Sequence, residues 1–210
     1  MDMLRSILGP SKREIWSQIA RDIGGEFIEG GFWGKDALVY GHGEWQILLD
    51  TYTVNHSSGS STNSHAITYT RLRAPFVNKD GLYFEIYRRG FFSSISKFLG
   101  MQDIEIGDPF FDDQFIIKGN NSEKIRLLLA DRRMKGLIEQ QPRIHLEIKN
   151  NDGWFGAAFP AHVDQLYFRC EGIVRETSLL KSLFELFSLT LERLVQIDSA
   201  YEDDPNVELR

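Results

Sequence analysis

The sequence predicts an α+β fold, in which antiparallel sheets in two halves of the chain carry helices on their outer side. Alternating apolar and polar residues, typical of half-buried strands, recur in both halves. Segments in which apolar residues recur at helical spacing flank these strands. The longest of them, 179–197, has one narrow polar stripe and predicts a long C-terminal helix that must be covered on several sides.

Residues 1–210 are expected to form a single α+β unit or, alternatively, two halves. The first half, 11–100, would contain an N-terminal helix and an antiparallel meander. The second half, 101–198, would contain a strand, two short helices, three strands and the long helix. This organisation predicts two sheets that pack against each other near the middle of the chain.

The stretch 100–121 lies at the midpoint and is rich in acidic residues and phenylalanine. Asp108-Pro109 ends any regular strand, because proline cannot donate to a ladder. Phe111 and Phe115 follow, four residues apart. We expect both rings to be buried and to lock the two halves together.

In the first half, a helix is predicted over 11–23, where Ser11 and Glu14 form a capping box. Strands are then predicted at 37–40, 45–54, 66–74 and 82–88, in an antiparallel meander. The segment between the second and third strands, 55–64, has the sequence NHSSGSSTNS and no apolar anchor. It is predicted to be a mobile hairpin loop.

In the second half, two short helices are predicted from their caps. Asn120 with Glu123 forms a second capping-box pattern, and Asp131 can cap the next helix, before Pro142 closes the pair.

Strands are predicted to follow these helices. A hairpin should pair 143–149 with 154–159, and a third strand should include 165–170. Alternation in that third strand places Cys170 on the apolar face, which favours a buried thiol over a catalytic one.

A pattern between 103 and 139 resembles a known family. The residues that carry it are Asp108-Pro109, Phe111, Phe115, Ile117, Gly119-Asn120-Asn121, Arg126, Leu128-Leu129 and Met134. They resemble a bacterial domain-of-unknown-function family whose motif runs D-P-x-F-x-x-x-F-x-V, a small and acidic turn, A-R-x-L-L and a Met-bearing helix. The chain departs from it at Asn120-Asn121, where the family has acids, and it lacks the membrane spans of many members. The resemblance implies an α+β fold and a bacterial source, and no activity.

Composition excludes several partners. The net charge of −6 and pI near 5.4 disfavour nucleic acid, whose binding needs clustered Lys and Arg. No transmembrane span is predicted, because even 179–197 contains several charged residues. The single cysteine and the absence of a signal-peptide pattern at Met1 indicate a reducing, cytoplasmic location.

Recognised catalytic and metal motifs are absent. Residues 30–36 do not form a phosphate-binding loop, because the pattern's first glycine would fall at Glu29. Neither the acids at 103–108 nor the pair His56 and His65 has the spacing of a metal site. We therefore predict no catalytic residue, no metal and no cofactor.

The candidate ligand-binding residues lie on two predicted strands. Alternation places three polar residues on one face of each strand, and these are Tyr69, Arg71, Arg73, Tyr83, Glu85 and Tyr87. If the two faces coincide, they form a polar aromatic surface that suits an anionic or aromatic ligand. The alternative is ordinary cross-strand pairing on a solvated sheet face.

Two classes of function fit the sequence. The first is a non-catalytic binding or assembly module, whose partner would be an unknown protein or a small anionic ligand; the missing catalytic motifs favour it. The second is a hydrolase or small-ligand enzyme whose site gathers distant residues such as His42, Glu44, Asp50 and His145.

The C-terminal helix is also the predicted contact of a homodimer. Packing of one face on the sheet would leave Leu179, Leu186 and Leu189 uncovered, and two-fold association would bury them. The competing account is that the N-terminal helix covers the same leucines through Ile15, Trp16 and Ile19.

Overall fold

The computed structural model describes residues 9–30, 35–57, 64–90, 102–150, 159–207 and 209. The helices are α2 (Lys12–Ile23), α3 (Pro109–Gln114), α4 (Ser122–Leu129), α5 (Arg132–Gln140) and α6 (Thr177–Gln196). The strands are β1 (Glu26–Ile28), β2 (Ala37–His42), β3 (Trp45–Ser57), β4 (Ser64–Asn78), β5 (Phe84–Arg88), β6 (Gln102–Asp103), β7 (Phe115–Gly119), β8 (His145–Lys149), β9 (Val163–Glu171) and β10 (Ala200–Tyr201).

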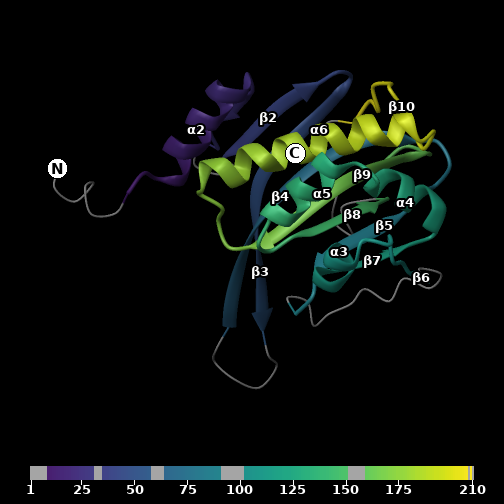
Figure 1. Cartoon of the computed structure of the whole chain (residues 1–210). Coiled ribbons are helices and arrows are strands. Elements are labelled where there is room, and N and C mark those ends of the chain that lie inside the picture. The colour runs from purple at the N-terminus through teal and green to yellow at the C-terminus, as the bar shows by residue number, and fades with distance from the viewer. Residues whose placement is uncertain are drawn as a thin grey trace, which may run out of the picture.

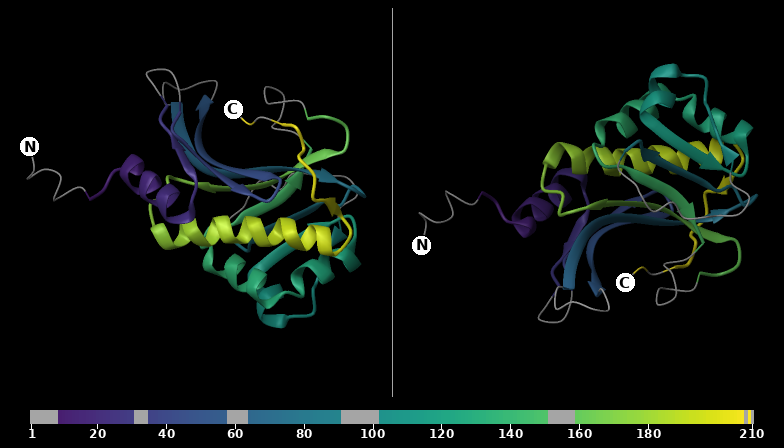
Figure 2. Two further views of the ribbon diagram at one scale, coloured as in Figure 1. Left: turned by 90° about the horizontal axis from the view of Figure 1, so that it is seen from above. Right: turned by 90° about the horizontal axis from the view of Figure 1, so that it is seen from below.

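These strands form one ten-stranded sheet in the order β1-β2-β3-β4-β9-β8-β5-β7-β6, and β10 pairs with β4 beside it. Every pair of strands in it is antiparallel. The helices gather on one face of the sheet, and the long hairpin of β3 and β4 bends toward the opposite side (Figures 1 and 2). The predicted α+β class, with helices outside an antiparallel sheet and a long C-terminal helix, is confirmed.

The expectation of two separate sheets is wrong. Strand β9 pairs with β4 through eight residue pairs, from Thr70–Cys170 to Val77–Val163, so the two halves share a ladder. The predicted meander also stops at β4, because β9 and β8 lie between β4 and β5. The segment after β4 is not a hairpin turn: the N–H groups of Asn78 and Lys79 donate to the carbonyls of His162 and Ser199. Whether 11–100 and 101–198 are separate domains stays a prediction.

The midpoint stretch behaves locally as predicted. Asp108 caps α3 by accepting from the N–H of Phe111, and Pro109 occupies the first turn. The rings of Phe111 and Phe115 stack with centroids 4.4 Å apart, and both side chains are buried.

Helix caps account for the helix starts. Ser11 and Glu14 form the predicted capping box of α2, and Asp131 caps α5 through the N–H of Met134. The second capping box is wrong by one residue, since Asn121 caps α4. The side chain of Asn120 instead bonds to the backbone before β5, which fixes the start of that strand.

Two predicted loop and strand assignments change. Strand β3 extends to Ser57 and β4 begins at Ser64, so both ends of the predicted 55–64 loop belong to paired strands. Residues 58–63 lie outside the described part of the chain. Strand β8 pairs with β9 on one side and β5 on the other, and of its predicted partner, 154–159, all but Phe159 lies outside the described residues.

Helix α6 is covered within the chain. It packs with α2, α4 and α5, and Leu186 is 0% exposed. The prediction that Leu179, Leu186 and Leu189 are left uncovered for a dimer contact is therefore wrong at Leu186, which is buried within the chain. Association itself stays a prediction. No helix among the described residues has the length and apolar character needed to span a membrane.

Candidate functional site

The register of the strands separates the two faces of the sheet. Residues directly opposite in neighbouring strands point to the same side. One row of partners across the sheet is apolar and lies under the helices: Leu49, Leu72, Phe168, Leu146, Ile86 and Ile117. The adjacent row, shifted by one residue, points to the other side and contains Arg73, Tyr167, Glu147, Glu85 and Lys118.

We call this second side the polar face. A further row on it consists of Asp50, Arg71 and Arg169 in register, with His145 and Tyr87 paired beyond them. Several of these side chains are deeply buried, including those of Arg73, Glu85 and His145. Buried charged groups destabilise a fold unless they are paired, so the partners of each one define the site.

The first cluster on the polar face centres on Asp50. Its two carboxylate oxygens accept from the Nε and Nη2 of Arg71, at 2.6 and 2.7 Å. The Nη2 of Arg73 donates to the same carboxylate at 3.1 Å. One acidic group on β3 thus fixes two arginines of β4 in a charge-assisted, partly bidentate arrangement.

Tyrosines surround this cluster. The rings of Tyr52 and Tyr69 stack with centroids 5.2 Å apart, and the Arg71 guanidinium lies 5.2 Å from the Tyr52 ring. The Tyr167 hydroxyl donates to that of Tyr52 at 3.4 Å, and the Lys149 ammonium lies 3.3 Å from the Tyr167 ring. The pKa of Tyr167 is raised, chiefly by burial and secondly by the neighbouring Tyr52. The positive charges of Arg71 and Lys149 therefore lie against aromatic faces, and this cation–π arrangement is electrostatically favourable.

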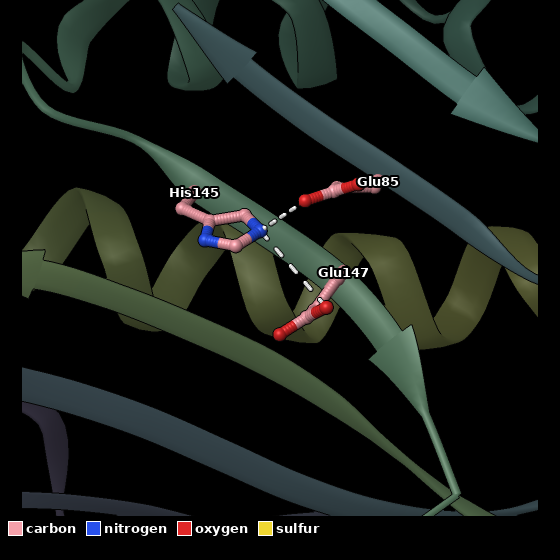
Figure 3. Close-up of side chains that lie close together, drawn as sticks. All are labelled: Glu85, His145 and Glu147. Carbon is pink, nitrogen blue, oxygen red and sulfur yellow. Dashed lines mark ion pairs between the residues drawn. The ribbon is translucent and has the colours of Figure 1, made fainter. Parts of the chain in front are cut away.

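The second cluster centres on His145 (Figure 3). Its Nε2 lies 2.8 Å from the Oε1 of Glu85 and 3.9 Å from the Oε2 of Glu147. On the other side of the ring, the Nε of Arg169 donates to Nδ1 at 3.0 Å. Because arginine can only donate, Nδ1 must accept, which places the ring hydrogen on Nε2, the nitrogen that faces the Glu85 carboxylate.

Glu85, His145 and Glu147 also present three ligand atoms within 4.8 Å of one another, which is close enough for a metal ion. The hydrogen bond from Arg169 argues against this use. A histidine that binds metal through Nε2 normally carries its hydrogen on Nδ1 and donates it to an acceptor. Here Nδ1 faces a donor that bears a positive charge, so the residues do not fit a resident cation.

Five of the six predicted site residues share the polar face. Tyr69, Arg71 and Arg73 belong to the first cluster. Glu85 belongs to the second, and the Tyr87 ring packs edge-on against His145 with centroids 6.2 Å apart. The two groups come from β4 and β5, which are not neighbours, and β9 and β8 connect them.

Tyr83 does not share this face. It precedes β5, so strand alternation does not place it, and its hydroxyl donates to Asp164 at 3.2 Å. Asp164 pairs with Phe76 in the helix-facing rows. Burial, together with Asp164, raises the pKa of Tyr83 to about 12. The prediction for Tyr83 is therefore wrong in its geometry.

The residues that join the clusters, above all Tyr167 and Arg169, were not among the predicted site residues. The sequence contained a signal for both, because they occupy the alternate, polar positions of the predicted strand 165–170. What was missing was the position of β9 beside β4. The side chains of the hypothetical enzyme site do not converge: His42 bonds to Glu192 of α6 on the helix side, whereas Asp50 and His145 lie on the polar face.

Fold and site together define an α+β protein with a helix layer on one face of its sheet and a buried charge network on the other. No protein-family model matches the sequence, and no curated protein matches it. Among solved structures, it is similar to the mycobacterial trehalose monomycolate transport factor A, TtfA. The identity is 7%, the TM-score is 0.51, and the match covers 87% of this chain and 94% of that one. At this identity the likeness shows the fold alone.

Proposed function

We propose that the protein is a non-catalytic binding module and that its polar face binds a small anionic ligand. The observation that carries this proposal is the pairing of Arg71 with Arg169, which stand directly opposite each other on β4 and β9. Like charges in this position destabilise a sheet. Asp50 offsets part of that repulsion at Arg71, and a bound anion near both guanidinium groups would offset more of it and would receive charge-assisted hydrogen bonds.

The surroundings of the arginines support binding. Asp50, which also accepts from the buried Arg73, holds Arg71 in place, so little side-chain entropy would be lost when a ligand binds. Arg71, Tyr52 and Tyr69 are only partly buried, and the two stacked rings offer a flat surface. A ligand with an aromatic or other planar part beside its anionic group fits this combination.

The same geometry argues against catalysis by the obvious candidates. Arg169 donates to Nδ1 of His145, and the buried Nε2 lies 2.8 Å from the Glu85 carboxylate, so neither ring nitrogen is open to a substrate as a general base. Burial raises the pKa of the Cys170 thiol to about 11, which leaves it protonated near neutral pH. The structural neighbour is named a transport factor, which agrees with a binding role.

Calorimetric titration with benzoate, inorganic phosphate and the neutral analogue benzamide tests the proposal. We expect saturable binding of benzoate or phosphate and none of benzamide. Arg71→Gln should weaken it about tenfold or more, from the loss of charge-assisted hydrogen bonds. The matched control is Arg133→Gln, since Arg133 lies on α5 and pairs with Glu185 on the helix side.

Far-UV circular dichroism must show that both variants are folded. Absence of binding by either anion, or binding that Arg71→Gln and Arg133→Gln leave equally strong, would overturn the assignment of the polar face.

A further inference from the structure

A separate pocket of about 210 Å³ opens on the helix side of the sheet, between the end of α5 and the start of α6. Its floor is formed by Phe168 and Cys170, which belong to the helix-facing rows of β9. Pro142, Val174 and Leu179 form apolar walls. The sheet therefore lies between this pocket and the polar face, and the two sites can be tested independently.

Hydrogen bonds hold the walls of the pocket in place. The Thr70 hydroxyl donates to the carbonyl of Gly172 at 2.7 Å and accepts from the N–H of Val174 at 2.9 Å. The indole N–H of Trp16 donates to the carbonyl of Val174. On the other side, the Gln141 side chain donates to Ser182 of α6 at 2.7 Å. The pocket is thus formed before any ligand arrives, as is usual for small-molecule sites.

Four charged residues line the rim, namely Arg143, Arg175, Glu171 and Glu176. Arg143 and Arg175 line the pocket, and within the described residues neither makes an ion pair or a side-chain hydrogen bond. Arg143 is close enough for its charge to act on the Cys170 thiol. The Glu176 carboxylate accepts from the Ser178 hydroxyl, and strand alternation directs the Glu171 side chain to the face opposite Cys170.

The start of α6 carries one of these acids. Glu176 occupies the N-cap position without making a side-chain cap hydrogen bond. The first turn of a helix carries unsatisfied N–H groups and favours negative charge.

From the cavity and its rim we infer that the pocket binds a small monoanion with an apolar body, of the class of arylalkanoic or short-chain fatty acids. An apolar cavity of about 150 Å³ is enough to bind benzene, so a volume of about 210 Å³ accommodates a ring with a short chain. The apolar body would lie on Phe168, Val174 and Leu179. The carboxylate would lie at the rim, between Arg143 and Arg175.

Three probes that share a phenyl ring test this assignment: 3-phenylpropionate, 3-phenylpropan-1-ol and 3-phenylpropylamine. In calorimetric titrations, we expect the carboxylate to bind at least about tenfold more tightly than the alcohol or the amine, the difference typical of charge-assisted hydrogen bonds. The double variant Arg143→Gln, Arg175→Gln should abolish this preference. Leu179→Trp should block all three probes by filling the cavity, and Arg133→Gln is the control outside the pocket.

Cys170 gives a second measurement, because it is the only cysteine of the chain and lines this pocket. Bound 3-phenylpropionate should slow its alkylation by iodoacetamide, and the alcohol at equal concentration should slow it less. Arg71→Gln should leave the protection of Cys170 unchanged, because Cys170 lines this pocket and the polar face lies on the other side of the sheet. Cys170 protection therefore tests this pocket alone, and the effect of Arg71→Gln on benzoate or phosphate binding tests the polar face. The inference is overturned if no probe binds the folded protein, if the alcohol binds as tightly as the carboxylate, or if Cys170 is not protected.

Discussion

Asp50→Asn is expected to destabilise the protein by about 3–5 kcal/mol, the range for removing one partner from a buried ion-pair network. The substitution keeps the size of the side chain and removes its charge. Asp50 is 5% exposed and binds both Arg71 and Arg73, and Arg73 is 1% exposed. Without the carboxylate, two guanidinium groups remain close together in a poorly solvated place, so the loss should exceed that of one hydrogen bond.

Urea unfolding, followed by circular dichroism, measures this loss as a shift of the midpoint at constant slope. Glu185→Gln makes the same chemical change in the exposed pair with Arg133, whose side chains are 42% and 68% exposed. That control should cost no more than about 1 kcal/mol. If Asp50→Asn proves no more damaging than Glu185→Gln, the polar face is better solvated than the structure indicates, and the cluster does not fix the arginines.

Three further predictions concern the helix side. Phe115→Ala should cost about 3 kcal/mol or more in urea unfolding, because the ring is buried and stacks on Phe111; a near-neutral result would contradict the central role of this pair. Leu186→Glu should lower the free energy of unfolding by several kcal/mol at every protein concentration, since it buries a carboxylate. If the variant is instead well folded and light scattering shows that it is a monomer where the parent is a dimer, the prediction of a dimer contact at Leu186 would be supported. Alkylation of Cys170 should stay slow at pH 8 and accelerate as the pH approaches about 11, because burial raises the pKa of the thiol. Reaction at pH 8 as fast as that of an exposed cysteine would show that the strand end is open.

Local signals in the sequence were enough to place most elements. The capping box at Ser11 and the cap at Asp131 locate the starts of α2 and α5 because these side chains bond to N–H groups three residues away. Alternation located β3, β4 and β8 in the same way, since it depends only on which side of a strand is buried.

The order of the strands could not be obtained from such signals. The segment between β4 and β5, with its Asn-Lys-Asp-Gly sequence, resembles a hairpin turn, yet it connects strands that are three positions apart in the sheet. The competing interactions come from distant residues: His162 and Ser199 accept the N–H groups that a hairpin would have used. For this reason parity predicted the shared face of five of the six candidate residues, whereas Tyr167 and Arg169, which lie between them in the sheet, were missed.

The two kinds of row on the sheet together determine which register is stable. A shift of β9 by one residue against β4 would turn Arg169 and Tyr167 toward the helices, and would turn Phe168 and Cys170 toward the charged cluster. The apolar row alone would resist this shift by losing burial. The polar row adds a second penalty, because Arg169 would lose its hydrogen bond to His145 and enter an apolar core. The buried charges that cost stability on the polar face therefore also restrict β9 to the register in which Arg71 and Arg169 stand opposite each other, which is the arrangement that the proposed anion site requires.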